Sequence, residues 1–175
     1  MRVICVACGP SLSVDQIEWV NRQDCVKIAV NNACYVISHP DYVLAADYEW
    51  WQVHDPKCGK RITSNPFITS TVTNFTSPIR GSYSSGGRAI EFAALQLGAT
   101  RIELLGYDCS VAKGSHFHGD HTGSLTNPNS DTTERWLSHY RKIRDYISCD
   151  IEILNYSLYT EIPNEIFPRL SRSWG

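Results

Sequence analysis

The stretch RVICVACGPSLSVDQIEWVNR, residues 2–22, begins with an apolar run, turns at a glycine and continues as an amphipathic segment. We predict a buried strand over Arg2–Cys8 and a helix over Ser13–Arg22 that begins at a capping serine. The corner between them, Gly9-Pro10-Ser11, exposes backbone N–H groups beside the positive end of the helix dipole, and both suit an anion such as phosphate. Because a tight turn and a capping serine are also ordinary α/β architecture, the corner alone leaves both interpretations open.

Apolar runs recur along the chain at the spacing of alternating strands and helices. Further strands are predicted over Cys25–Val30, Tyr42–Asp47, Lys60–Ser64, Arg101–Asp108 and Asp150–Tyr156. Further helices are predicted over Gly87–Leu97 and Asp131–Ile147. Near-continuous apolar runs are typical of parallel strands covered on both faces. The sequence therefore predicts an α/β fold, with a single doubly wound, mostly parallel, Rossmann-like sheet and helices on both faces.

The composition narrows the class of protein. The chain has 175 residues, of which 42% are hydrophobic, and its formal net charge is −2. This length suits one domain over residues 1–175, and the charge argues against bulk nucleic-acid binding. No stretch approaches the roughly 18 apolar residues of a membrane helix. The short apolar run between Arg2 and Gly9 is too brief for a signal peptide, so we expect a cytoplasmic protein.

The seven cysteines are an odd number, and several of them lie in or beside predicted strands. Without an export signal we expect reduced thiols. Cys5 and Cys8 have the CxxC spacing of redox and zinc sites, but no second CxxC accompanies them. We interpret the pair as two small core residues.

Two polar segments, residues 65–85 and 109–130, are longer than the connections that a minimal α/β sheet requires. The first is rich in Ser and Thr, and the second in Gly, His, Asn and Ser. Polar loops of about 20 residues are uncommon in compact domains unless they serve a function or move. We therefore expect 109–130 to be an active-site loop or lid.

Polar residues follow the predicted strands at their carboxyl ends, where ligands collect in a doubly wound sheet. Asn31 and Asn32 have the groups to bond a base or a ribose, or to form a turn. Asp47 has the group to hold a ribose or a metal, or to cap the next helix. Asp108 ends the strand before the histidine-rich loop. The convergence of these groups on one edge predicts a binding site there.

A second candidate anion site opens the helix at SSGGR, residues 84–88. Glycines let a ligand approach the backbone closely, and the start of a helix attracts phosphate. A purely structural cap needs only one of these residues. We therefore predict ligand contact at Ser84, Ser85, Gly86 and Gly87.

The stretch HFHGDH, residues 116–121, concentrates three histidines and a carboxylate. One histidine is suited to act as a general base, because imidazole titrates near neutral pH. The same side chains occur in metal sites, and a solvated polar loop is the third interpretation. We favour catalysis within this stretch, with His116, Asp120 and His121 as the candidate residues, and assign no metal.

The chain resembles the bacterial sialyltransferases of glycosyltransferase family 42 in the order of its motifs. These are GPSL, an asparagine-containing strand end, SSGGRAIEFAALQLGATRIELLGYD, a histidine loop, and a final helix and strand. It is also similar to the pterin diphosphokinase-like family that carries the DUF115 domain. The resemblance spans residues 1–160 and is most specific over 82–108. The short chain suits a phage-encoded member.

This resemblance implies a glycosyltransferase that uses a nucleotide sugar, CMP-linked in the family, and requires no metal or other cofactor. His121 matches the family's general base, which deprotonates the acceptor hydroxyl as the nucleotide leaves. With the strand-end residues included, the predicted nucleotide-binding set is Gly9, Pro10, Ser11, Asn31, Asn32, Asp47, Ser84, Ser85, Gly86, Gly87 and Asp108. The family places tyrosines after its Gly-x-Asp strand to assist the departing phosphate, and the aligned positions here are Ser110 and His116. Sialic acid specificity therefore does not carry over.

Two other functions fit the residues. A DUF115-type phosphotransferase would use ATP and Mg²⁺, for which Asp47 and Glu49 offer carboxylates. A non-catalytic nucleotide-binding protein would hold its ligand without turnover. In each case we expect a small-molecule nucleotide or nucleotide sugar as partner, with no membrane span. Assembly into a homo-oligomer is compatible with both families.

Overall fold

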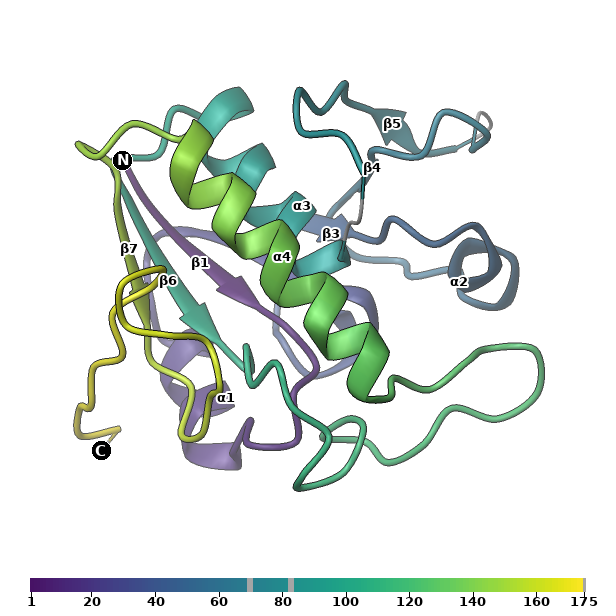
Figure 1. Cartoon of the computed structure of the whole chain (residues 1–175). Helices are drawn as coiled ribbons and strands as arrows, with labels where there is room; N and C mark the ends of the chain where they lie inside the picture. The colour runs from purple at the N-terminus through teal and green to yellow at the C-terminus, as the bar shows by residue number, and fades with distance from the viewer. Residues whose placement is uncertain (69–70, 82–83, 175) are drawn as a thin grey trace.

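The computed structural model describes residues 1–68, 71–81 and 84–174, and within them seven strands form one sheet. The strands are β1 (Arg2–Val6), β2 (Val26–Val30), β3 (Tyr42–Leu44), β4 (Lys60–Thr63), β5 (Thr73–Asn74), β6 (Arg101–Leu105) and β7 (Glu152–Asn155). Their order is β5-β4-β3-β2-β1-β6-β7, and every neighbouring pair is parallel. The doubly wound α/β fold expected from the sequence is confirmed (Figure 1).

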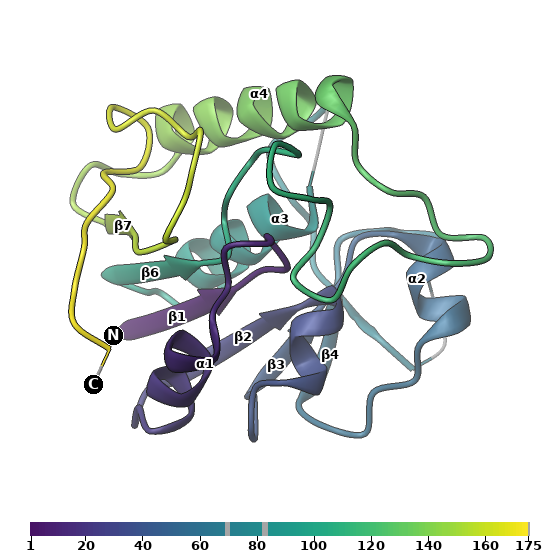
Figure 2. The ribbon, with the colours of Figure 1, turned by 90° about the horizontal axis from the view of Figure 1, so that it is seen from below.

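Helices cover both faces of this sheet. They are α1 (Val14–Asn21), the 3-10 turn η1 (Asn31–Tyr35), α2 (Tyr48–Val53), α3 (Ser85–Glu91), its π-helical continuation η2 (Phe92–Gln96), and α4 (Ser130–Tyr146). Figure 2 shows α3 and α4 on one face and α1 on the other. In β1, Val3 and Cys5 pack toward the first face, and Ile4 and Val6 toward the second. Burial on both faces explains why the strands read as continuous apolar runs.

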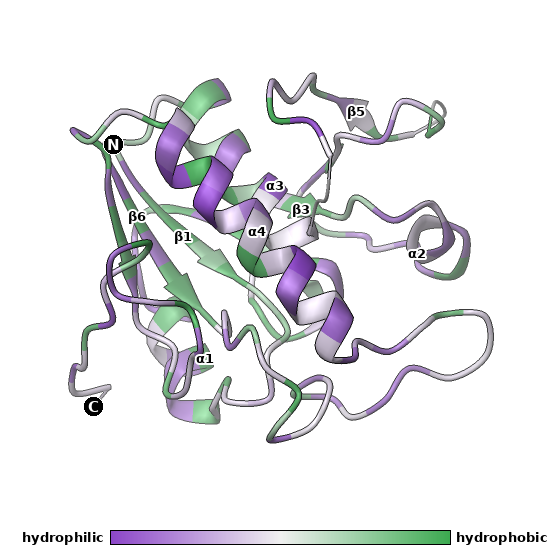
Figure 3. Ribbon diagram, viewed as in Figure 1, coloured by the Kyte–Doolittle hydropathy of each residue, from purple (hydrophilic) through white to green (hydrophobic). Residues whose placement is uncertain are grey.

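Hydropathy follows the same layers (Figure 3). The ribbon of β1 is hydrophobic along most of its length, whereas α4 shows many hydrophilic residues. One stripe of α4 is apolar and faces the sheet, since Tyr140 and Ile143 are buried and Trp136 packs against the same cluster. A helix with one apolar stripe can cover a sheet while its other side meets water.

Three strands that lead into the site end earlier than the sequence predicted, and for two of them a glycine lies at the turn that follows. The predicted strand over Arg2–Cys8 ends at Val6, and Gly9 N donates a hydrogen bond to Gly106 O at 2.9 Å. The strand over Arg101–Asp108 ends at Leu105, where Gly106 adopts a positive φ of 70°. The strand over Tyr42–Asp47 likewise ends at Leu44. The removed residues form the loops that face the site.

Three short elements were not predicted: β5, α2 and η1. β5 has two residues, Thr73 and Asn74, and both are polar and exposed, so the sequence contains no apolar run that would predict a strand there. The helix predicted over Gly87–Leu97 begins two residues earlier, at Ser85, and Gly98 follows it with a φ of 66°. Glycine tolerates this left-handed conformation and ends helices for that reason.

The segment after β7 packs along that edge strand. Asn155 N donates to Pro168 O at 2.8 Å, and Leu170 N donates to Asn155 O at 2.9 Å. Phe167 is fully buried in the core. The segment therefore pairs with the backbone of a strand that would otherwise be a sheet edge.

All seven cysteines lie among the described residues and are free thiols. Cys5 and Cys8 are both buried, which confirms their interpretation as core residues. Burial raises the pKa of the Cys8 thiol to about 12, so it stays protonated and unreactive. Of the helices in the described part of the chain, none combines the length and apolar character needed to cross a bilayer.

Candidate functional site

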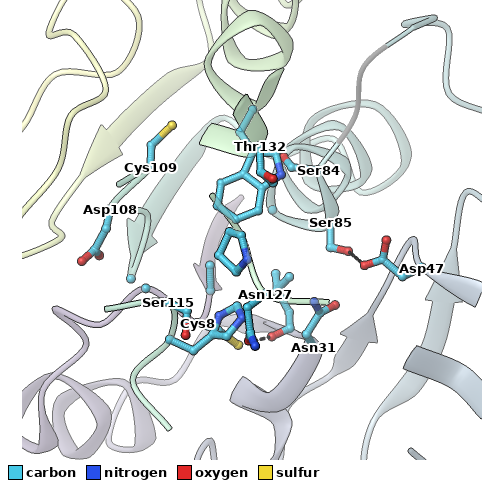
Figure 4. A pocket seen from close by; sticks show the side chains of 18 of the residues that line it. Cys8, Asn31, Asp47, Ser84, Ser85, Asp108, Cys109, Ser115, Asn127 and Thr132 are labelled. Carbon is cyan, nitrogen blue, oxygen red and sulfur yellow. Dashed lines mark hydrogen bonds between the residues drawn. The ribbon is translucent and has the colours of Figure 1, made fainter. Parts of the chain in front are cut away.

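A cavity of about 620 Å³ lies at the carboxyl ends of the parallel strands (Figure 4). Its wall is formed by the loops after β1, β2 and β3 and by part of the long loop between β6 and α4. The start of α3 and the first half of α4 complete the wall. The chain runs outward from β1 to β5 and then returns to β6 on the other side of β1. The cavity therefore lies at the point where the strand order reverses, which is where open α/β sheets bind ligands.

Most of the predicted site residues line this cavity. They are Gly9, Pro10, Asn31, Asp47, Ser84, Ser85, Gly86, Asp108, His116 and His121. Four others belong to the described residues but not to the cavity wall: Ser11, Asn32, Gly87 and Asp120. The contacts of each residue explain why it does or does not line the cavity.

The glycine corner after β1 holds a carboxylate of the chain itself. Ser11 N donates to Asp108 Oδ2 at 2.8 Å, and Ser11 Oγ donates to Asp108 Oδ1 at 2.7 Å. A Cβ at Gly9 would lie 2.3 Å from Asp108 Oδ1 and 2.4 Å from Gly106 O. Burial raises the pKa of Asp108, and the two Ser11 bonds oppose that shift. The donors predicted for a phosphate are therefore engaged by Asp108.

The structure separates the two asparagines that the sequence left undistinguished. Asn32 Oδ1 accepts a hydrogen bond from Trp50 Nε1 at 2.8 Å, which fixes a fully buried ring. Asn31 has a positive φ of 50° and lines the cavity. Its Oδ1 is buried and has no hydrogen-bond partner among the described residues. A buried acceptor without a partner is costly, so Asn31 is the better ligand contact.

Asp47 and Ser85 join the end of β3 to the start of α3. Ser85 Oγ donates to Asp47 Oδ2 at 3.3 Å and accepts from Ala46 N at 3.0 Å. Figure 4 shows the two side chains pointing toward each other. Asp47 takes the capping position of α2, but its side chain makes no capping hydrogen bond there. Burial raises the pKa of its carboxyl, which lines the cavity.

The two glycines of α3 make room for side chains of the core. A Cβ at Gly86 would lie 3.0 Å from the Tyr107 ring and 3.2 Å from Tyr140 Oη. A Cβ at Gly87 would lie 2.4 Å from His139 Nδ1. The missing side chain of Gly87 therefore leaves room for the His139 ring. Gly87 does not belong to the cavity wall that the described residues form. The packing alone explains why both positions need glycine.

His139, which the sequence analysis did not single out, connects α4 to the start of α3. Its Nδ1 accepts from Ser84 N at 2.9 Å, and its Nε2 lies 2.8 Å from Glu91 Oε1. Since Nδ1 accepts, the proton is on Nε2 and is donated to Glu91. Ser84 Oγ is 3.5 Å from the same Nδ1, but that lone pair already binds a backbone N–H. The Ser–His–Glu series is therefore a structural contact rather than a nucleophilic triad.

Burial of His139 makes the stability of the fold depend on pH. Burial lowers the pKa of this ring from its ordinary 6.5, while the Glu91 carboxylate acts in the opposite direction. The unfolded chain takes up a proton below pH 6.5 and the folded chain resists it, so stability is full above this pH and falls as the pH decreases toward the folded pKa.

Urea unfolding at a series of pH values measures this dependence. The free energy of unfolding should decrease below pH 6.5, by at most about 1.4 kcal/mol per pH unit for this one proton. In a His139→Gln variant that share of the slope should disappear. An identical slope in the two proteins would contradict the assignment of a neutral His139.

Three histidine rings lie close together beside the cavity, and two of them, His116 and His121, line its wall. The metal-binding nitrogens of His116, His118 and His121 all lie within 4.8 Å of one another. Burial lowers the pKa of all three imidazoles, that of His116 to about 4. Asp120, predicted beside them, is exposed and accepts a hydrogen bond from the Ser115 hydroxyl. The three rings therefore lie close enough together to share one partner.

Other residues that line the cavity did not emerge from the sequence analysis. Arg135 and Trp136 come from the first turns of α4, and Arg135 adds a guanidinium group to the cavity wall. The sequence places both on a helix with mixed faces, and only the packing of α4 over α3 brings them to the strand ends. Arg135 is exposed at the rim, where it can meet a charged ligand.

Comparison of the chain with protein-family models, with curated proteins and with solved structures gave no match.

Proposed function

We propose that this chain is a transferase that uses a nucleotide sugar and binds it in the cavity at the strand ends. The observation that carries the proposal is one cavity that combines an unpartnered buried acceptor, a helix start and a histidine cluster. Its volume of about 620 Å³ falls in the range of small-molecule sites. The motif order shared with the sialyltransferases of family 42 supports the same reaction class.

The nucleoside would bind at the ends of β2 and β3. Asn31 Oδ1 is an acceptor in need of a donor, and base amino groups and ribose hydroxyls are such donors. The Asp47 carboxyl is directed by Ser85 and lines the same wall. A carboxylate at the end of such a strand is suited to bind ribose hydroxyls.

The phosphates would bind near α3 and Arg135 rather than at the glycine corner after β1. The corner's Ser11 donors are engaged by Asp108, whose charge repels a phosphate. Ser84, Ser85 and Gly86 line the cavity at the beginning of α3, where the helix dipole favours an anion. Arg135 supplies a permanent positive charge from α4.

The acceptor hydroxyl would be activated at the histidine cluster. His116 and His121 line the cavity, and their rings are 4.5 Å apart between centroids. His116 takes the place of a family tyrosine, and Ser110, the other such position, donates to Glu161 Oε1 at 2.8 Å. For the sugar to be transferred, the histidine cluster must lie on the side of the bound nucleotide sugar from which the acceptor substrate approaches.

A second candidate is the ATP- and Mg²⁺-dependent phosphotransferase. Asp47 and Glu49 both line the cavity, and the charge of Glu49 contributes to the raised pKa of Asp47. One or two carboxylates on a cavity wall are a common arrangement for Mg²⁺ bound together with substrate phosphates. This candidate predicts nucleotide binding that depends on Mg²⁺.

A thermal-shift screen distinguishes these functions. CMP, CDP, UDP, GDP, ADP and ATP are each tested with and without Mg²⁺, because a ligand that binds only the folded state raises the melting temperature. Stabilisation without Mg²⁺ supports the glycosyltransferase. Stabilisation by ATP with Mg²⁺ alone supports the phosphotransferase. Stabilisation with no turnover of any donor supports a non-catalytic binder, and no stabilisation by any nucleotide contradicts all three.

An Asn31→Gly variant tests the nucleoside contact. Glycine adopts the φ of 50° without strain, so the change removes the amide and leaves the backbone intact. Affinity for the stabilising nucleotide should fall about 10-fold, the effect of one lost hydrogen bond. Isothermal titration measures it, and an unchanged affinity would remove Asn31 from the site.

A further inference from the structure

The histidine cluster of the loop between β6 and α4 has the composition of a metal site. His116, His118 and His121 present three nitrogen donors within 4.8 Å of one another, and their ring centroids lie 4.5 to 5.0 Å apart. In a tetrahedral Zn²⁺ site the ligand nitrogens are about 3.3 Å apart, as Zn–N bonds of about 2.0 to 2.1 Å require. Rotation about the side-chain bonds closes the remaining difference.

One of these donor nitrogens has no partner among the residues that the structure describes. His116 Nε2 is buried and makes no hydrogen bond with the described residues. The ring stacks on His118 with an interplanar angle of 11° and lies 4.5 Å from His121. A buried imidazole nitrogen that lies beside two other imidazoles and makes no hydrogen bond is unsatisfied, and a metal ion shared with the other two rings would satisfy it.

The backbone holds the loop in place around the cluster. Phe117 N donates to Cys8 O at 2.9 Å, which fixes the centre of the HFHGDH stretch against the loop after β1. His121 N donates to Asn127 Oδ1 at 2.7 Å. Two of the three donors are thus adjacent to a fixed backbone position, so less conformational freedom is lost when an ion binds.

The donor set selects the kind of ion. Imidazole nitrogens suit Zn²⁺ and its neighbours among the transition metals, whereas Mg²⁺ and Ca²⁺ prefer oxygen ligands. Three protein ligands with a free fourth position are typical of catalytic zinc sites. His116 and His121 both line the cavity, so the free position would face the space in which the ligand binds.

We propose that His116, His118 and His121 bind one Zn²⁺ ion, with its fourth coordination position open to the cavity. This assignment departs from the metal-free site expected from the sequence and does not depend on the identity of the nucleotide. An oxygen of the cavity's ligand, from a hydroxyl or a phosphate, would complete the coordination. A metal there gives the cluster a way to activate a hydroxyl without a free histidine base.

Metal titration of the whole chain tests the proposal. The protein is stripped with a chelator, dialysed, and titrated with Zn²⁺ and separately with Co²⁺, in the absence of any nucleotide. We expect one ion per chain, and a visible Co²⁺ spectrum of tetrahedral type. Failure of every nucleotide to bind would contradict the proposed function and leave this result standing.

Two variants identify the ligands. His118 is exposed, so His118→Ala should keep the fold while Zn²⁺ affinity falls at least about 100-fold, more than outer-shell changes usually cost. The matched control is His39→Asn, because His39 is exposed and precedes β3, at the amino ends of the strands and therefore away from the cavity. It should bind Zn²⁺ as the wild type does. No binding by the wild type, equal binding by His118→Ala, or equal loss in His39→Asn would each overturn the proposal.

Discussion

A His139→Ala variant is expected to lose about 2 to 4 kcal/mol of stability, because it leaves buried polar groups without partners and opens a cavity. His139 is fully buried between α4 and α3. Its removal leaves the Ser84 N–H without an acceptor and takes away a donor to Glu91. It also opens a cavity next to Gly87, which is a glycine because the ring is there. Urea unfolding followed by circular dichroism measures the loss.

The control for this variant is Arg141→Ala on the same helix. Arg141 is exposed, and surface substitutions of this kind usually change stability by less than about 0.5 kcal/mol. A loss in His139→Ala no greater than that in the control would show that His139 does not join the two helices.

A Gly9→Ala variant is expected to lose about 2 to 3 kcal/mol, because overpacking of a rigid site costs energy. The new methyl group would lie 2.3 Å from Asp108 Oδ1 and 2.4 Å from the Gly106 carbonyl oxygen. The second contact is with backbone, so the clash cannot be relieved by turning one side chain. The loops after β1 and β6 must separate, and the cavity between them changes shape. The midpoint of urea unfolding reports the loss.

Gly98→Ala is the informative comparison. Gly98 has a φ of 66° and no atom within 4 Å of an added Cβ, so this change has room but strains the backbone. Its expected cost is about 1 kcal/mol. If Gly9→Ala cost no more than Gly98→Ala, the tight contact between the two loops would be wrong.

The sheet could be predicted because strands that are buried on both faces consist of nearly continuous apolar residues. Each of the six predicted strands is present. Five of them end one to three residues earlier than predicted, and β2 ends at Val30 as predicted. β5 could not be predicted, since two exposed polar residues pair with β4 only through their backbone. The edge of the sheet that carries the cavity followed from the parallel arrangement alone.

The detail of the site could not be predicted, because it depends on contacts between distant residues. Ser11 is engaged by Asp108, and both had been assigned to the nucleotide. The turn η1 decides that Asn31 lines the cavity and that Asn32 binds Trp50. His139 lies next to Tyr140 of the apolar stripe, and a histidine on a helix gives no sign of the glycine it will face. These are tertiary contacts, which local patterns do not encode.

The position of β1 has a consequence for how the chain folds. β1 is an interior strand of the sheet, and it pairs on one side with β2 and on the other with β6, with Arg2 opposite Arg101. A polypeptide leaving the ribosome can form the β1–β2 pair early, but β1 keeps an unpaired apolar edge until β6 has been synthesised. Closing so long a loop is slow, and the waiting strand is exposed to association with other chains. We therefore expect folding during synthesis to depend on the rate of translation up to β6, and on chaperones that shield the first strand.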